Sequence, residues 1–192
     1  MIAARPDMTA EELVGYDIPG KRVELVRGQV MVREPASLRH GEVSLRIGVA
    51  LANHLAQERD AQGWALARGR VATADPGFTL ARSPDTVRAP DVAYVSRERH
   101  SGPMPEGFPQ FAPDLAVEVR SRGDRAGDVQ AKVGDWLSAG TTLVWVIDPA
   151  RKAATVYRAD GTVSVLGGDD ALTGEALLPG FGLPLRELFL DE

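Results

Sequence analysis

Hydrophobic residues recur at helical spacing in two long stretches of the chain. Between residues 37 and 59, apolar side chains return every three or four positions, which predicts an amphipathic helix with Ser37 as its N-cap. A second helix is expected over residues 124–138, with Asp124 as its N-cap and Gly140 as the glycine that ends it. Two shorter helices are expected at residues 9–13, capped by Thr9, and 185–190.

Between the helices, apolar and polar residues alternate, which is the pattern of half-buried strands. Residues 22–32 are expected to form a hairpin that turns at Gly28. Three consecutive antiparallel strands are expected next, at residues 64–71, 77–80 and 89–95. The remaining strands are expected at residues 113–120, 142–148, 154–158 and 162–166.

The order of these elements indicates the fold class. The strand at 113–120, the helix after it and the strand at 142–148 form one crossover unit. We therefore expect an α/β fold with a mixed central sheet, flanked by helices and preceded by an N-terminal hairpin. The chain has 192 residues, 44% of them hydrophobic, and it shows no repeat, so we expect one domain, residues 1–192, in which residues 1–20 form an N-terminal arm.

Composition excludes several classes of chemistry. The chain has no cysteine, which rules out disulfides, thiolate catalysis and Cys/His zinc sites, so a metal would bind mainly to carboxylates. The net charge is -5, so the chain lacks the basic surface of a general nucleic-acid coat, although local binding stays open. The sequence contains no apolar run long enough for a membrane span and no signal-like start, and we expect a cytoplasmic protein.

Two Ala-Pro-Asp tripeptides stand at the entrances of two predicted strands, and they end at Asp91 and Asp114. A Pro-Asp pair by itself is more typical of a turn than of a catalytic site. Glu118, however, lies inside the second of these strands, and a carboxylate in a protein interior must be paired, protonated or bound to a cation. An ion pair with Arg120 or Arg122 is the alternative interpretation.

Lysine is rare in this chain, which makes Lys132 informative. It is one of three lysines among 22 basic residues, and it lies at the edge of the apolar face of the predicted helix 124–138. Its aliphatic part could pack on Trp136 and leave the ammonium in water. The helix follows the Glu118 strand, however, so its inward face can bring the ammonium near the carboxylates. Asp91, Glu118 and Lys132 thus form a candidate constellation of two acids and one amine.

A series of segments along most of the chain carries a family resemblance. The segments are residues 23–28, His40-Gly41, residues 87–95 around Asp91, residues 112–119 around Glu118, Lys132, Ala139-Gly140, residues 144–149 and Leu-Pro-Gly-Phe at 178–181. Taken in order, they resemble the Uma-type restriction endonuclease family, which belongs to the PD-(D/E)XK nuclease superfamily. The resemblance implies a restriction-endonuclease-like core.

The resemblance also implies a metal site. Asp91 and Glu118 would bind a divalent cation, Mg²⁺ or Mn²⁺, for which oxygen ligands are suited, together with the carbonyl oxygen of Val119. In the superfamily the catalytic lysine lies two residues after the second acid, where this chain has Arg120. In the Uma-type family the lysine is displaced to the following helix, which matches Lys132.

Further site residues are expected around this core. The resemblance includes Glu24 and His40 as outer members, although a hairpin glutamate is usually solvated and a histidine in the first turn of a helix usually lies on the surface. Arg120, Arg122 and Arg125 are the local candidates for phosphate contact, because guanidinium groups match phosphate oxygens.

The expected function is that of a Mg²⁺-dependent endonuclease-like phosphodiesterase that hydrolyses DNA. Whether a homodimer supplies the second cut of a duplex stays open. Two alternatives remain, because a fold does not fix a function. The first is a non-catalytic binding or assembly module on a nuclease scaffold, and the second is a metal-dependent phosphoesterase that acts on small nucleotides.

Overall fold

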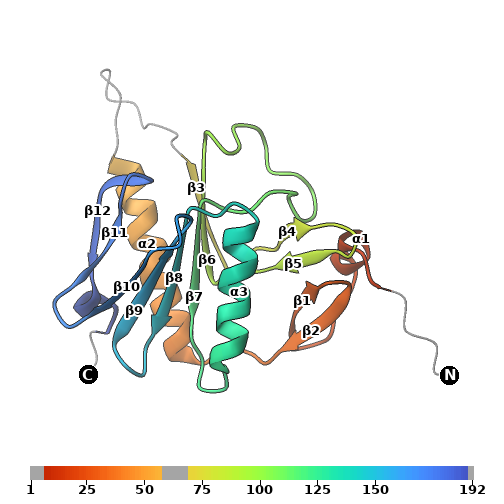
Figure 1. Ribbon diagram of the computed structural model, residues 1–192, viewed down its shortest axis with the longest axis horizontal. Coiled ribbons are helices and arrows are strands. Elements are labelled where there is room, and N and C mark those ends of the chain that lie inside the picture. Colours follow the sequence, from red (N-terminus) through yellow and green to blue (C-terminus); the bar gives the residue numbers. More distant parts are fainter. Residues whose placement is uncertain (1–6, 58–68, 190–192) are drawn as a thin grey trace.

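A six-stranded sheet with a long helix on each face forms the centre of the computed structural model, which describes residues 7–57 and 69–189 (Figure 1). The strand order is β10-β9-β8-β7-β6-β3. Its strands are β3 (Gly69–Thr73), β6 (Val92–Ser96), β7 (Leu115–Val119), β8 (Leu143–Asp148), β9 (Ala153–Arg158) and β10 (Val163–Gly167). Among the described strands of this sheet, only β7 and β8 pair in parallel, and α3 (Ala126–Ser138) connects them, which confirms the predicted crossover unit and the mixed sheet.

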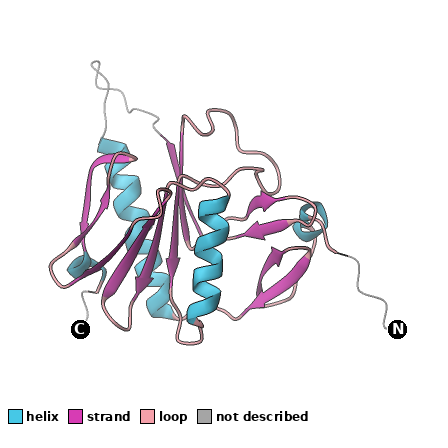
Figure 2. Cartoon of the chain, in the orientation of Figure 1, coloured by secondary structure: helices cyan, strands magenta, loops and turns pink. Residues whose placement is uncertain are grey.

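The two long helices cover opposite faces of this sheet (Figure 2). On one face, α2 (Leu38–Gln57) buries Val43, Ile47 and Leu51 against strand residues such as Val117 and Trp145. On the other face, the buried side chains of α3 pack against the residues that alternate with these in the same strands. Each side chain of β7 therefore faces either α2 or α3.

A second sheet, with the order β2-β1-β5-β4, stands beside α3 (Figure 1). It consists of β1 (Arg22–Val26), β2 (Gln29–Arg33), β4 (Phe78–Ala81) and β5 (Thr86–Arg88). The predicted hairpin is confirmed, and Gly28, with a φ of 76°, lies in its turn. The short helix α1 (Ala10–Val14) has the predicted Thr9 capping box, and its buried Leu13 packs with Leu25 of β1.

The expected run of three consecutive antiparallel strands is wrong in its pairing. β3 pairs with β6 in the central sheet, whereas β4 pairs with β5 in the second sheet. The strand predicted over residues 89–95 is shorter than expected: β5 ends at Arg88, and β6 begins only at Val92. Ala89, Pro90 and Asp91 separate the two strands, and the chain crosses between the sheets at these residues. The strand is interrupted here because proline has no N–H to donate to a ladder. Residues 64–68 of the first predicted strand lie outside the described residues.

The ends of the helices differ slightly from expectation. Ser37 caps α2 as predicted, since its hydroxyl accepts the backbone N–H of His40 at 3.3 Å. Asp124, however, does not cap α3, which begins at Ala126; its carboxylate accepts the N–H of Ser121 instead, at 2.7 Å, and shapes the loop before the helix. No helix in residues 7–57 and 69–189 has both the length and the hydropathy of a membrane span.

The C-terminal part adds one hairpin that the sequence pattern did not predict. It consists of β11 (Ala171–Gly174) and β12 (Leu178–Pro184), and it is followed by the 3₁₀ helix η1 (Leu185–Leu188) where a short helix was expected. The pairing shifts register between Thr173 and Gly174, and glycines interrupt the alternation of β12. Leu172, Phe181 and Leu185 join the core on the α2 face of the sheet.

Candidate functional site

The register between β6 and β7 places the two predicted acids side by side. Val92 pairs with Val117, so Asp91, just before β6, lies opposite Glu118, near the end of β7. The backbone N–H of Asp91 donates to the carbonyl of Val117 at 3.0 Å, which continues the ladder to this point. Both acids line a pocket of about 310 Å³, whose other walls come from the β1–β2 hairpin, the turn after β3, the start of α2, the loop after β7 and the first half of α3.

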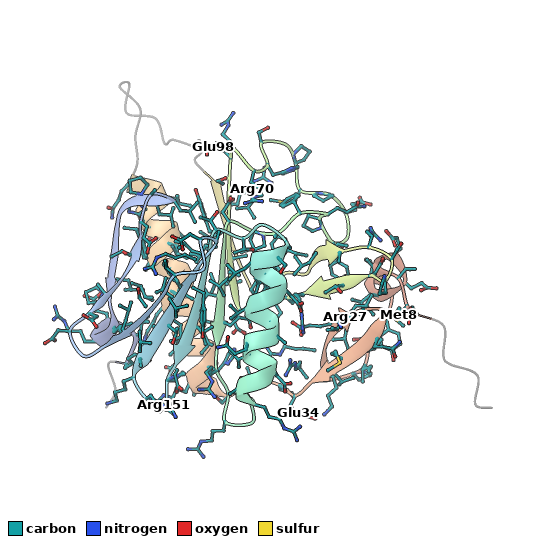
Figure 3. All side chains as sticks on the ribbon, in the orientation of Figure 1. Met8, Arg27, Glu34, Arg70, Glu98 and Arg151 are labelled. Carbon is teal, nitrogen blue, oxygen red and sulfur yellow. The ribbon has the colours of Figure 1, made fainter. Side chains whose placement is uncertain are left out.

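The pocket lies at the edge of the molecule where β7 ends and α3 begins. Figure 3 labels Glu34, just after β2, and Arg151, in the turn after β8, on the same edge. The site thus lies where the hairpin of the second sheet approaches the central sheet.

Lys132 lies between two of the carboxylates. Its Nζ is 2.7 Å from Oε2 of Glu118 and 3.0 Å from Oε1 of Glu24, and only 14% of its side chain is exposed. The other oxygen of Glu118 accepts a hydrogen bond from the indole N–H of Trp136 at 2.9 Å. Lys132 therefore faces the pocket, as one of the two interpretations of the sequence expected, and its ammonium contacts the acids rather than water.

Burial and charge together shift the proton affinities of this cluster. Burial raises the pKa of Glu118 to about 7; the Lys132 ammonium opposes this, while Asp91 and Glu24 add to it. Burial disfavours the charged form of Lys132, but Glu118 and Glu24 outweigh it and raise the pKa of the lysine. Burial also works against the charge of Glu24, yet Lys132 and Arg88 hold its pKa below the usual value. Near neutral pH, the site thus holds a fixed ammonium beside a carboxyl group that readily takes or gives up a proton.

Three protein groups contact the carboxylate of Asp91 and hold it in place. Its Oδ1 is 2.7 Å from Nε2 of His40 and 3.4 Å from Nη1 of Arg22, and its Oδ2 accepts the backbone N–H of Val119 at 2.6 Å. Nδ1 of His40 in turn lies 3.3 Å from the hydroxyl of Ser121. The three contacts, which come from one side chain of α2, one side chain of β1 and one backbone N–H, fix the orientation of the carboxylate, and Ser121 supports the imidazole from behind.

Glu24 and His40 are both buried, unlike a typical hairpin glutamate or first-turn histidine. The side chain of Glu24 is 4% exposed because Arg88 donates to it at 3.0 Å and the N–H of Ala89 at 3.2 Å, which ties β1 to the crossing between the sheets. His40 is buried because α2 begins directly behind Asp91. Both residues line the same pocket as Asp91 and Glu118.

The arginine cluster divides into one pocket residue and two surface residues. Arg120 lines the pocket, but its guanidinium donates to Asp148 at 2.7 Å and not to Glu118. Arg122 and Arg125 are exposed in the loop between β7 and α3, outside the pocket lining. The alternative ion pair of Glu118 with Arg120 or Arg122 is therefore not formed; the partner of Glu118 is Lys132.

The sequence pattern missed several pocket residues. Arg22 and Arg33 come from the hairpin, Asp75 from the turn after β3, and Ser121 from the loop after β7. Strand alternation does carry one signal, because Arg22 is two residues from Glu24 and shares its face. Asp75 carried no such signal, since an Asp-Pro-Gly sequence is typical of an ordinary turn.

A divalent cation fits the chemistry of this pocket. Asp91 and Glu118 offer hard carboxylate oxygens, and Oδ2 of Asp91 and both oxygens of Glu118 keep acceptor capacity beyond the one hydrogen bond that each accepts. In the described part of the chain, no group of three or more His, Asp or Glu side chains is arranged as a complete ligand set. Mg²⁺ does not need one, because it is commonly bound through one or two carboxylates and keeps several waters.

Comparison with known proteins agrees with this architecture. A crystal structure from Anabaena variabilis ATCC 29413, described as "a putative nuclease belonging to DUF820", matches 95% of this chain and 98% of that chain, with a TM-score of 0.79 and 18% sequence identity. At that identity the likeness shows the shared fold, which is restriction-endonuclease-like. A search of curated proteins finds no match. The family model of Uma2, described as "Putative restriction endonuclease", matches residues 10–186, so the chain belongs to the Uma2 family.

Proposed function

We propose that the protein is a Mg²⁺-dependent (or Mn²⁺-dependent) endonuclease that hydrolyses phosphodiester bonds in DNA. Membership of the Uma2 family supports a nuclease-type function, and restriction-endonuclease-like families generally use divalent metals. The observation that carries the proposal is the convergence of two acids and one amine, since Lys132 contacts Glu118 at 2.7 Å in the pocket that Asp91 also lines. This is the set of groups that metal-dependent phosphodiester hydrolysis needs.

Each residue of the pocket has a distinct part in this proposal. Asp91 and Glu118 would hold the cation, which polarises a phosphate oxygen and lowers the pKa of a water molecule. Lys132 would donate to the phosphate oxygens or to the attacking water, as a compact ammonium can. Trp136 and His40 orient the two carboxylates through their N–H groups, so that neither acid has to reorganise when charge develops.

Substrate contacts outside the metal pair are proposed for the arginines. Arg120 lines the pocket, and its Nε is buried without an acceptor among the described residues. Arg122 and Arg125 are exposed in the adjoining loop, where they can reach phosphates further along a strand. A homodimer would provide two such sites for a double-strand break.

Plasmid cleavage tests the proposal. The wild type is expected to nick or linearise supercoiled DNA with Mg²⁺ or Mn²⁺ and to stop when EDTA is added. Asp91→Asn, Glu118→Gln and Lys132→Ala are expected to lower the rate at least 100-fold, within the range that positioned catalytic groups supply. Asp169→Asn, at a 99% exposed side chain, is the control and should match the wild type. Equal cleavage by all the variants would refute the assignment.

One observation favours the small-nucleotide alternative. The acidic groups are recessed, with 8% of the Asp91 side chain and 11% of the Glu118 side chain exposed, so a small molecule enters more easily than a rigid duplex. A substrate series from mononucleotides through short single strands to plasmid DNA separates the two activities. A catalytic rate that peaks at the mononucleotide would favour the phosphoesterase. A non-catalytic module would show neither cleavage nor Mg²⁺ binding.

A further inference from the structure

Two arginines stand next to each other on the hairpin wall of the pocket. Arg22 of β1 and Arg33 of β2 are register partners in the antiparallel hairpin, and both line the pocket that contains Asp91 and Glu118. Their side chains are 32% and 27% exposed, so both are reachable from solvent. Directly opposed residues of such a pair lie close together, and two like charges there are unfavourable unless something compensates them.

The protein compensates Arg22 but leaves part of its guanidinium unused. Nη1 contacts Asp75 at 2.8 Å and Asp91 at 3.4 Å, and neither contact uses Nη2. Nε is buried and has no acceptor among the residues that the structure describes. A buried donor without a partner is unfavourable, so a ligand that brings an acceptor to this guanidinium would be favoured.

Asp75 holds Arg22 from a strained turn. Both Asp75 and the preceding Ala74 have a left-handed backbone, with φ values of 58° and 66°. Neither is glycine, and such conformations cost energy and persist where the surrounding structure requires them. The turn therefore keeps a carboxylate beside Arg22, and the arginine is positioned before any ligand arrives.

Arg33 is compensated less completely. Its Nε is 3.8 Å from Oε2 of Glu24, which is too long for a hydrogen bond. Glu24 does not depend on it, because Lys132, Arg88 and the N–H of Ala89 already contact its two oxygens. The folded protein thus has no need of Arg33 for the stability of Glu24, and the charge of the arginine is available to a ligand.

We propose that Arg22 and Arg33 form a second phosphate-binding subsite, which takes a phosphodiester group adjacent to the scissile one on a nucleic-acid strand. The inference rests on the proposed function, because it assumes that the scissile phosphate binds beside Lys132. Guanidinium groups present forked donors that match two phosphate oxygens, and a pair of them carries the charge that a second phosphate brings. The subsite requires a polynucleotide, since a nucleoside monophosphate has one phosphate only.

The salt dependence of binding tests the subsite without any cleavage. The fluorescence anisotropy of a labelled 12-nucleotide single strand is titrated with protein at several salt concentrations, with Ca²⁺ in place of Mg²⁺. Removal of one phosphate contact lowers the slope of log K against log salt by about 0.7 for a single strand. Arg33→Ala is expected to show this loss, and Arg33→Lys is expected to restore most of it. Arg186→Ala, which removes a 68% exposed arginine outside the pocket, should keep the wild-type slope.

Each outcome decides between the two proposals. An unchanged slope in Arg33→Ala would overturn the subsite, whatever the cleavage activity. A reduced slope in a protein that cleaves no nucleic acid would support the subsite and overturn the endonuclease. Arg33→Ala is also titrated with a nucleoside monophosphate; an equal loss of affinity for this ligand would contradict a site for a second phosphate. Arg22→Lys provides the second variant, because it keeps the charge beside Asp75 and Asp91 while it removes the fork.

Discussion

Asp91 and Asp114 make the same hydrogen bond at opposite ends of one strand pair. Each follows a proline and precedes a strand, and each carboxylate accepts the N–H at the end of the partner strand: Asp91 from Val119 at 2.6 Å and Asp114 from Ser96 at 2.7 Å. The repeated Ala-Pro-Asp is therefore first a device for joining β6 and β7. Its surroundings differ, because Asp114 is paired with Arg99 at 2.8 Å while Asp91 faces the pocket.

This difference predicts opposite effects of the same substitution. Asp114→Asn should destabilise the protein by about 3 kcal/mol, because it leaves Arg99 without its buried partner, and should leave cleavage per folded molecule unchanged. Asp91→Asn should abolish cleavage with a smaller loss of stability. Chemical denaturation and plasmid cleavage are measured for both variants. A loss of cleavage in Asp114→Asn at a temperature where it is fully folded would contradict the division of roles.

The order of the central helices and strands could be predicted from the sequence, because the hydrophobic pattern of each element is local. Helical spacing located α2 and α3, and the apolar run of β8 with its preceding helix indicated a parallel crossover. Strand pairing is not local. The exchange of strands between the two sheets at Pro90 depends on which edge is free after β1 and β2 have paired, and no spacing within residues 64–95 records that.

The residues of the candidate site could also be predicted from the sequence only in part. Lys132 was identifiable because a lysine at the edge of an apolar helix face is unusual, and the structure brings it to Glu118. Glu24 required the resemblance, since its burial comes from Arg88 across the second sheet. Asp75 and Arg33 reach the pocket only through tertiary folding, so the local pattern did not distinguish them from turn and surface residues.

Lys132 is expected to stabilise the fold as well as the reaction. Lys132→Met leaves Glu118 and Glu24 without their shared ammonium, and removal of one partner of a buried pair typically costs about 3–5 kcal/mol. The double variant Glu118→Gln/Lys132→Met should recover much of this loss, because one of the two uncompensated acids is then neutral. Urea denaturation of the two single variants and the double variant measures the coupling. Additive losses would show that the contact is not energetically significant.

The recovery of stability in the double variant should not restore cleavage. If it did, Glu118 and Lys132 would have only a structural part, and the proposed roles of these two residues in catalysis would be wrong. The comparison thus separates the energetic and the chemical consequences of one contact.

Asp75→Asn is expected to affect catalysis more than binding. The change removes a negative charge from the pocket wall, so oligonucleotide affinity should stay the same or increase. It also weakens the contact that holds Arg22, so the phosphate should be placed less accurately and kcat should fall by about tenfold, or 1.4 kcal/mol of activation free energy. Steady-state kinetics on a short oligonucleotide separates kcat from KM. A rise in KM at constant kcat would show that Asp75 acts on binding instead.

The raised pKa of Glu118 predicts that metal binding depends on pH around neutrality. With a pKa of about 7 in the metal-free protein, Glu118 carries a proton at pH 6 and is mostly ionised at pH 8. A cation that binds to the carboxylate must displace that proton, so apparent Mn²⁺ affinity should fall about tenfold for each pH unit below about 7 and level off above it. A carboxylate with an ordinary pKa near 4.5 would show no such fall until about pH 5.

Isothermal titration calorimetry in buffers of different ionisation enthalpy counts the protons released, which should approach one per metal ion at pH 6. His40→Gln is the control, because it removes a contact of Asp91 and leaves Glu118 in place, and it should retain the pH dependence while Glu118→Gln loses it. Proton release that persists in Glu118→Gln would show that another group supplies the proton and would contradict the prediction.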